Sequence, residues 1–144
     1  MIKKICSLAL LLAFCTPVFA VEKVAVIDVQ KVVNKSAQVQ ALKKEQEAKS
    51  KEIRNFIKKA NDEIKAQTDE KKKQDLVKKY EKELSAKREA NAKVYKTKLE
   101  AIDKTISATI NNYAKTNGYD LVIVKGAVLY GGDDITEAVS KVVK

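Results

Sequence analysis

Residues 38–116 read QVQALKKEQEAKSKEIRNFIKKANDEIKAQTDEKKKQDLVKKYEKELSAKREANAKVYKTKLEAIDKTISATINNYAKT, a run of 79 residues that contains no proline, glycine or cysteine. Lysine, glutamate, alanine and glutamine dominate this run, and all four residue types favour helix. A stretch of that length without a helix breaker indicates helix, and a polar helix this long must leave the globule that holds its ends. We therefore expect a small body that carries a long arm.

Two antiparallel helices are expected within the arm. The first, residues 37–66, places apolar or small side chains at alternating spacings of three and four, although Gln46 and Lys49 interrupt the stripe. This is the period of a coiled coil with a dilute core. Residues 67–75 contain no apolar side chain, so a helix there would have nothing to bury, and we place the tip of a helical hairpin there. The return helix is expected over residues 75–113.

The segments that flank the arm, residues 21–37 and 117–144, are expected to form the body. Residues 23–29 are β-branched and apolar on both faces, which suits a strand covered on both sides. Near the C-terminus, two further β-like runs predict a strand hairpin that turns at a glycine, with its strands at residues 119–125 and 127–130. The body is thus expected to contain one strand that precedes the arm, and two strands and a helix that follow it.

The last helix is expected to open at Asp134. Glu137 follows three residues later, which is the spacing of a capping box, and the helix should end near Val143. A cation site at Asp133 and Asp134 is the alternative, but a turn followed by a helix cap explains both residues. The predicted fold class is α+β, with a small β-rich oligomerisation body and a long antiparallel, coiled-coil-like helical hairpin as its arm.

Residues 1–20 have the parts of a secretory signal peptide. Two lysines open the segment, a short apolar run follows, and residues up to Ala20 suit cleavage by a signal peptidase. The apolar run is too short to remain as a membrane anchor. A lipid-modified Cys15 is the alternative, and the bulky Phe14 before it argues against that modification. We expect cleavage after Ala20 and export to the periplasm.

Removal of that segment leaves 124 residues without cysteine or histidine. No disulfide framework is then available, and the body contains only 45 residues, which is too few to bury a stable core alone. We therefore expect the body to oligomerise. The apolar residues expected in the oligomer body are Val24, Val26, Ile27, Leu121, Val122, Ile123, Val124, Val128 and Ile135.

The same inventory argues against an enzyme. The processed chain offers no histidine or cysteine for acid-base or nucleophilic chemistry, and its sequence contains no glycine-rich phosphate-binding loop. Ser140 beside Lys141 in a terminal helix is no evidence for a serine nucleophile. We expect no catalytic residues, no bound metal and no cofactor.

The arm carries the excess positive charge, with 21 basic and 13 acidic residues in residues 38–116. This charge would suit phosphate binding, but the sequence has no known DNA-binding module and few aromatic residues on which bases could stack, so we expect no physiological nucleic-acid partner. The lysines near the tip are either solvated helix surface or a contact for anionic lipid headgroups. They are Lys71, Lys72, Lys73, Lys78 and Lys79.

The apolar residues of the arm are the candidate surface for an unfolded protein client. They are spaced too sparsely to close a dry seam along the whole arm. Phe56 with Ile57, and Val94 with Tyr95, are adjacent pairs that cannot both point into one seam, so we expect one member of each pair to be exposed. The full set of client-binding candidates is Ile53, Phe56, Ile57, Ile64, Leu76, Tyr80, Leu84, Val94 and Tyr95.

These features together resemble the Skp (OmpH) family of periplasmic chaperones. The resemblance is carried by the signal peptide, the first strand Lys23 to Asp28, the long charged hairpin, the run Tyr119 to Val124, and Tyr130 with Asp134-Ile135-Thr136 before a terminal helix. It implies a homotrimer with a shared body. Three arms would enclose a cavity that holds unfolded outer-membrane proteins without ATP. A lipopolysaccharide site proposed for some relatives cannot be transferred to particular residues of this arm.

Two classes of protein compete with that hypothesis. The first is a structural coiled-coil protein of the cell envelope that binds a folded partner. The second is a basic protein that binds lipid or nucleic acid through the charge of the arm. An assay of client aggregation separates the chaperone from both.

Overall fold

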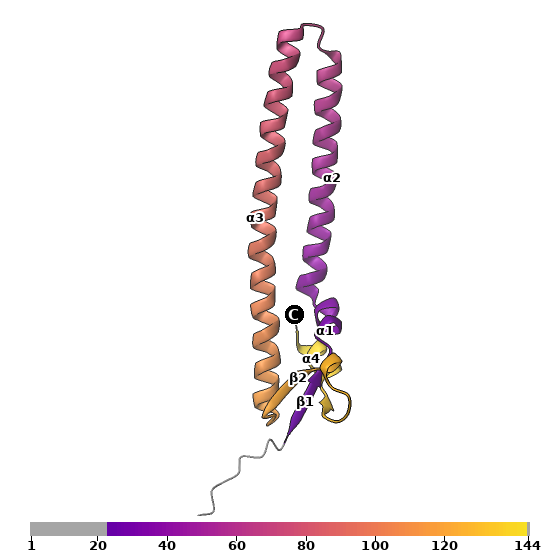
Figure 1. The fold of residues 1–144 in the computed structure, drawn as a ribbon, viewed down its shortest axis with the longest axis vertical. Helices are drawn as coiled ribbons and strands as arrows, with labels where there is room; N and C mark the ends of the chain where they lie inside the picture. Colours follow the sequence, from indigo (N-terminus) through magenta and orange to yellow (C-terminus); the bar gives the residue numbers. More distant parts are fainter. Residues whose placement is uncertain (1–22, 144) are drawn as a thin grey trace, which may run out of the picture.

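The computed structural model describes residues 23–143, and the predicted signal peptide lies outside the described residues. Within them, a long helical hairpin rises from a small body of strands and short helices (Figure 1). The α+β class with a hairpin arm is therefore confirmed.

The arm consists of α2 (Ala37–Ala66) and α3 (Glu70–Thr116), of 30 and 47 residues. At about 1.5 Å per residue they rise about 45 and 70 Å. The turn occupies residues 67–69, a part of the predicted tip. α3 begins about five residues earlier than we expected, because the Asp69 carboxylate accepts a hydrogen bond of 3.1 Å from the backbone N–H of Lys72 and caps the helix. The hydrogen bond to Asp69 is thus enough to start α3 at residues that have no apolar side chain to bury.

A short helix, α1 (Val29–Lys35), precedes the arm. The Asp28 side chain caps it by accepting from the Lys31 N–H at 3.0 Å. Ser36 then interrupts the helical path: its own N–H still bonds back to α1, while its backbone is extended and its hydroxyl caps α2. α1 and α2 are therefore two separate helices joined at a fully buried serine.

Three parallel strands form the sheet in the order β2-β1-β3. They are β1 (Val24–Ile27), β2 (Leu121–Val124) and β3 (Asp133–Asp134). β1 is central and aligns Val24 with Leu121 on one side and Ala25 with Asp133 on the other.

The predicted strand hairpin at residues 119–130 is wrong. After β2 the chain forms a 3-10 turn, η1 (Lys125–Ala127), and then crosses to the far edge of the sheet, where β3 pairs with β1. Gly131 and Gly132 make the return with φ of 88° and 85°, a backbone conformation that favours glycine. The β-like residues 127–130 are therefore left without a strand partner in this part of the chain.

The predicted capping box is also wrong. The last helix, α4 (Thr136–Val142), has Ile135 at its N-cap. Asp134 belongs to β3, and its carboxylate accepts hydrogen bonds from the Thr136 N–H at 3.0 Å and the Lys125 ammonium at 2.6 Å. Glu137 turns outward instead and pairs with two lysines of α1. Glu137 forms these ion pairs instead of a capping hydrogen bond because α4 packs directly beside α1.

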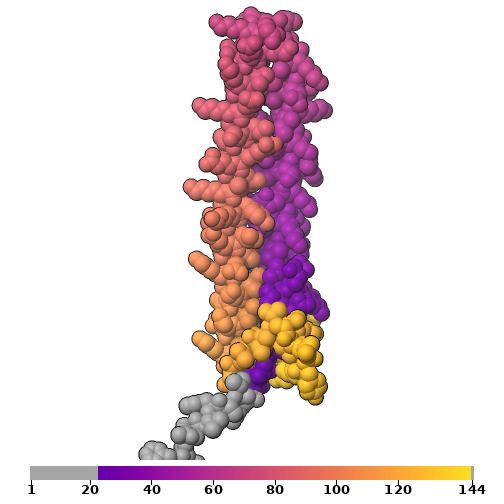
Figure 2. All heavy atoms as spheres, viewed as in Figure 1, coloured from indigo at the N-terminus to yellow at the C-terminus, as the bar shows by residue number. Residues whose placement is uncertain are grey.

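One core joins the arm to the body. Its buried members come from β1, the three helices near the base of the arm, and the C-terminal segment, so the body is not built from the flanking residues alone. Figure 2 shows the side chains of α2 and α3 filling the space between the two helices above this core. The buried apolar residues are Ala25, Ile27, Val32, Leu42, Ile102, Ile106, Ile135, Val139 and Val143.

The ion pairs of Glu137 make the body sensitive to acid. The ammonium groups of Lys31 and Lys35 lie 2.8 and 2.6 Å from its carboxylate oxygens and hold the pKa of Glu137 at about 2, below the ordinary 4.5. This stabilisation is complete above the unfolded-state pKa and is lost as the pH falls towards about 2. The thermal midpoint should therefore fall over that interval.

Glu137→Gln should reduce that fall, while the matched change Glu89→Gln on an exposed part of the arm should leave it as in the parent chain. Thermal melts followed by circular dichroism at a series of pH values measure the effect. The thermal midpoint of Glu137→Gln should still depend on pH to some extent, because hydrogen bonds from Lys125 and Thr136 also lower the pKa of Asp134. Identical acid profiles for the Glu137→Gln and parent chains would contradict this role of the ion pairs.

Candidate functional site

In the outer part of the arm, an aromatic contact joins α2 to α3. Phe56 of α2 and Tyr80 of α3 meet edge to face, with ring centroids 5.6 Å apart, and the Lys87 ammonium lies 5.3 Å from the Phe56 ring centroid. The Tyr80 hydroxyl donates a hydrogen bond to the Glu63 carboxylate. This bond, with some burial, raises the pKa of Tyr80 to about 12. The two helices are thus pinned together near the tip.

The middle of the seam is polar. The Asn91 amide donates to the Gln46 side-chain oxygen at 3.3 Å, and the buried amide nitrogen of Gln46 has no hydrogen-bond partner among the described residues. Lys98 and Glu45 pair across the helices at 2.5 Å. Next to these groups is a small open cavity of about 230 Å³. The polar groups therefore replace apolar packing where Gln46 and Lys49 had predicted a dilute seam.

An apolar groove opens at the base of the arm, with a volume of about 810 Å³. Its rim carries one lysine and three acidic residues, Lys43, Glu47, Glu100 and Asp103. Its floor is formed by side chains from α1, α2 and α3, several of which also pack against the core. The apolar lining consists of Val29, Val33, Val39, Leu42, Tyr95, Leu99, Ile102, Ile106 and Ile110.

Large apolar side chains next to this groove are open to solvent. Tyr95 is 39% exposed and Leu99 is 47% exposed, and the neighbouring Val94 is 46% exposed. Val94 lines the small cavity beside the polar section, and Tyr95 lines the groove. They are exposed because the facing α2 residues there are polar, so no apolar side chain covers them. The most exposed apolar residues of the arm therefore lie in its lower half.

The predicted client-binding residues divide into two groups. Those of the outer arm are half-buried in or beside the seam: Ile53, Phe56, Ile57, Ile64, Leu76, Tyr80 and Leu84. Val94 and Tyr95 are exposed. The expectation of one exposed member per adjacent pair is therefore wrong in both places. Two packed helices cover the residues beside their contact only partly, so Phe56 and Ile57 are both half-buried. In the polar section, α2 covers neither Val94 nor Tyr95.

Sequence reasoning missed the groove because its floor combines three helices. Val29 was predicted as the end of the first strand, although its spacing of four residues from Val33 places both on one face of a helix. Leu99 lies within the predicted return helix but was not among the predicted client-binding residues. Only the position of α1 beside the base of the arm brings these three residues together.

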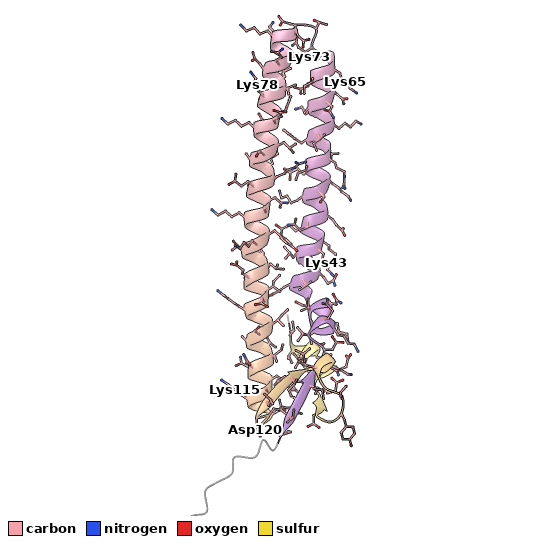
Figure 3. The ribbon with its side chains drawn as sticks, in the orientation of Figure 1. Lys43, Lys65, Lys73, Lys78, Lys115 and Asp120 are labelled. Atoms are coloured by element: carbon pink, nitrogen blue, oxygen red, sulfur yellow. The ribbon has the colours of Figure 1, made fainter. Side chains whose placement is uncertain are left out.

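The predicted tip lysines belong to the first three turns of α3 at the outer end of the arm, and their contact with anionic lipid stays a prediction. Figure 3 shows Lys65, Lys73 and Lys78 near the end of the arm, with Lys43 near the base and Lys115 at the body end of α3. The Lys79 ammonium lies 5.5 Å from the Tyr80 ring centroid, and Lys73 is half-buried. Lysines therefore occur at the tip of the arm and also lower on both of its helices.

The predicted oligomer-body residues differ in their availability to another chain. Val26, Ile27 and Ile135 are already buried within the chain. Leu121 and Val124 of β2 are 44% and 54% exposed, and the remaining members are half-buried: Val24, Val122, Ile123 and Val128. Only the β2 side of the body thus presents apolar surface from this set.

Within residues 23–143, no helix is both long and apolar enough to span a bilayer. No group of three or more acidic, histidine or cysteine side chains in that range is arranged to hold a metal ion. Asp133 and Asp134 are bonded instead to Tyr119, Lys125 and Thr136.

A family model described as outer membrane protein (OmpH-like) matches residues 23–143. The chain belongs to this OmpH-like family, to which the Skp chaperones also belong. It is a family of periplasmic chaperones that bind outer membrane proteins. No curated protein matches the chain in a direct sequence search.

Replacing both Gln46 and Asn91 by leucine should stabilise the arm. The double change removes a buried amide nitrogen without a partner and supplies apolar contact in its place, whereas Gln46→Leu alone leaves the Asn91 amide without its bond. We expect the single change to be less stable than the double change by about 1–3 kcal/mol. Denaturant melts of the parent, both single variants and the double variant measure this coupling. Additive single effects would contradict it.

Proposed function

We propose that this chain is an ATP-independent periplasmic holdase that keeps unfolded outer-membrane proteins from aggregating. It would act as a homotrimer whose arms surround the client. The observation that carries the proposal is the open apolar groove at the base of the arm, with Tyr95 and Leu99 exposed along it. Membership of the OmpH-like family supports the same function.

The groove has the properties that a holding surface requires. Its lining is apolar and continuous over three helices, so it can receive side chains that an unfolded barrel protein has not yet buried. It is open rather than enclosed, and it ends in the polar section of the seam around Gln46. Contacts of this kind are individually weak and tolerate many sequences, which suits a chain without a fixed structure.

The charge of the arm supports capture of the client. With 21 basic against 13 acidic residues, the arm attracts a net acidic unfolded chain over a distance and raises the rate of encounter. The apolar groove then contributes the short-range attraction. Salt should therefore slow capture more than it accelerates release.

A trimer is proposed because one chain leaves its body incomplete. Within residues 23–143 the sheet has three strands, one of them two residues long, and β2 is exposed at its edge. A larger shared core would cover that edge and gather several grooves around one space. Sedimentation at several concentrations tests whether the body exists as a monomer.

Tyr95→Gln with Leu99→Gln should weaken the holding of clients. Each change removes about 1 kcal/mol of apolar contact, so the pair should raise the concentration needed to suppress aggregation about 30-fold. Glutamine favours helix, so α3 should remain intact. Light scattering of a diluted outer-membrane β-barrel protein measures the effect.

Val142→Gln is the matched control. Val142 is a similarly exposed apolar residue, but it belongs to α4 and not to the groove. This variant should suppress aggregation as well as the parent chain does. Equal activity of the double groove variant and the control, with both chains folded, would show that the groove does not hold the client.

A further inference from the structure

The apolar groove at the base of the arm is long enough to receive a short extended segment. Five of its lining residues come from α3, at spacings of three or four residues that place them on one stripe of the helix: Tyr95, Leu99, Ile102, Ile106 and Ile110. From Tyr95 to Ile110 the helix rises about 22 Å. About seven residues of extended chain cover the same distance. The groove therefore fits a segment of a client chain rather than a single side chain.

The rim of the groove has the opposite charge to the arm. Its basic residue is Lys43, and its three acidic residues are Glu47, Glu100 and Asp103. The arm as a whole has 21 basic and 13 acidic residues. A cationic group that enters the groove therefore meets a net negative rim, although the arm around it is net positive.

Two of the rim carboxylates are available to bind a cation. Neither Glu47 nor Asp103 has an ion-pair partner within residues 23–143, and both are exposed. Glu100 has only a loose contact, with its carboxylate 4.0 Å from the Lys96 ammonium. The Glu45 carboxylate, which does not line the groove, already pairs with a lysine. The unpaired acidic groups of the lower arm thus lie at the rim of the groove.

Tyr95 adds a second feature that favours a cation. Its side chain lines the groove and is 39% exposed, and its ring has no cation partner within residues 23–143. In the outer arm, by contrast, the rings of Phe56 and Tyr80 have lysine ammonium groups 5.3 and 5.5 Å from their centroids. An arginine guanidinium can lie over an open ring while it bonds to a nearby carboxylate. The groove thus offers both kinds of contact to an arginine.

We propose that the groove takes those segments of an unfolded client in which a few apolar residues are flanked by arginine or lysine. The apolar residues would pack on Leu99 and Ile106, and the flanking cations would pair with Glu47 and Asp103 at the rim. Arginine would bind better than lysine because it can also lie over Tyr95. This inference rests on the proposed function and names the class of segment that its groove selects.

The arm and the groove then act at different ranges. The net positive arm attracts an acidic client as a whole, and the net negative rim selects basic segments within that client after contact. If the net charge of the arm alone governed binding, acidic segments would bind best instead. The sign of the preference therefore distinguishes a groove with its own specificity from a generally basic surface.

Three labelled peptides measure this preference in the processed chain. Each has the same core of alternating leucine and glutamine, and both ends carry arginine in the first peptide, glutamine in the second and glutamate in the third. Fluorescence anisotropy gives the three dissociation constants. We expect the arginine peptide to bind about fivefold more tightly than the glutamine peptide, because exposed ion pairs are individually weak, and the glutamate peptide to bind most weakly. Equal or tighter binding of the glutamate peptide would overturn the inference.

Removal of the rim charge should abolish the preference. Glu47→Gln with Asp103→Asn should bring the arginine and glutamine peptides to the same dissociation constant. Asp62→Asn with Glu89→Gln is the matched control, because it removes the same two charges from exposed positions of α2 and α3 outside the groove. The control should keep the preference of the parent chain. The same preference in both variants would show that the rim carboxylates do not select the segment and would overturn the inference.

Two further variants give independent measurements. Glu47→Lys with Asp103→Lys should reverse the preference, so that the glutamate peptide binds most tightly. Tyr95→Leu keeps an apolar side chain in the groove and should weaken the arginine peptide more than a peptide that ends in lysine. A preference for arginine that survives the charge reversal would overturn the inference, and an unchanged ratio of arginine to lysine binding would overturn the role of Tyr95.

The light-scattering assay separates this inference from the proposed function. If the parent chain suppresses client aggregation but the peptides bind without a charge preference, the selection of basic segments is wrong and the holdase function stands. If the preference is present and depends on the rim, but the chain does not suppress aggregation, the selection is correct and the holdase function is wrong.

Discussion

The packing of the base of the arm against the body is the contact on which the rest of the structure depends. Leu42 of α2 and Ile106 of α3 share one buried core with Ile27 of β1 and Val139 of α4. Neither part has enough apolar residues to fold alone, because the body is small and the outer arm is mostly polar. This shared core fixes the direction of the arm and brings α1 beside it.

The same constraint accounts for the exposed groove. α1 ends at Ser36 and the chain starts a new helix, so the apolar faces of α1 and α2 meet α3 without closing over it completely. Above the groove, the Gln46–Asn91 pair replaces apolar packing. The two helices of the arm are thus closely packed at its base and in contact through Phe56 and Tyr80 towards its tip. The arm is most open between these two places. Close packing and open apolar surface therefore lie on different parts of one hairpin.

The sequence predicted the hairpin, its dilute seam and the α+β class, because helix propensity and apolar spacing are local signals. It did not predict the start of α3 at Glu70, where a single capping aspartate outweighs the missing apolar face. It also failed at residues 127–130, whose composition favours a strand but whose partner depends on a crossover in the sheet. The groove was missed for a similar reason, since α1, α2 and α3 meet only in three dimensions.

We propose that clients are held at the base of the arm rather than along its tip. The most direct measurement places a photo-crosslinking amino acid at Leu99 in the groove, at Lys71 near the tip, and at Val142 in α4, and then adds an unfolded outer-membrane β-barrel protein. Strong cross-links to the client from Leu99, with weak ones from Lys71 and Val142, are the predicted result. Equal or stronger cross-links from Lys71, or none from Leu99, would contradict the claim.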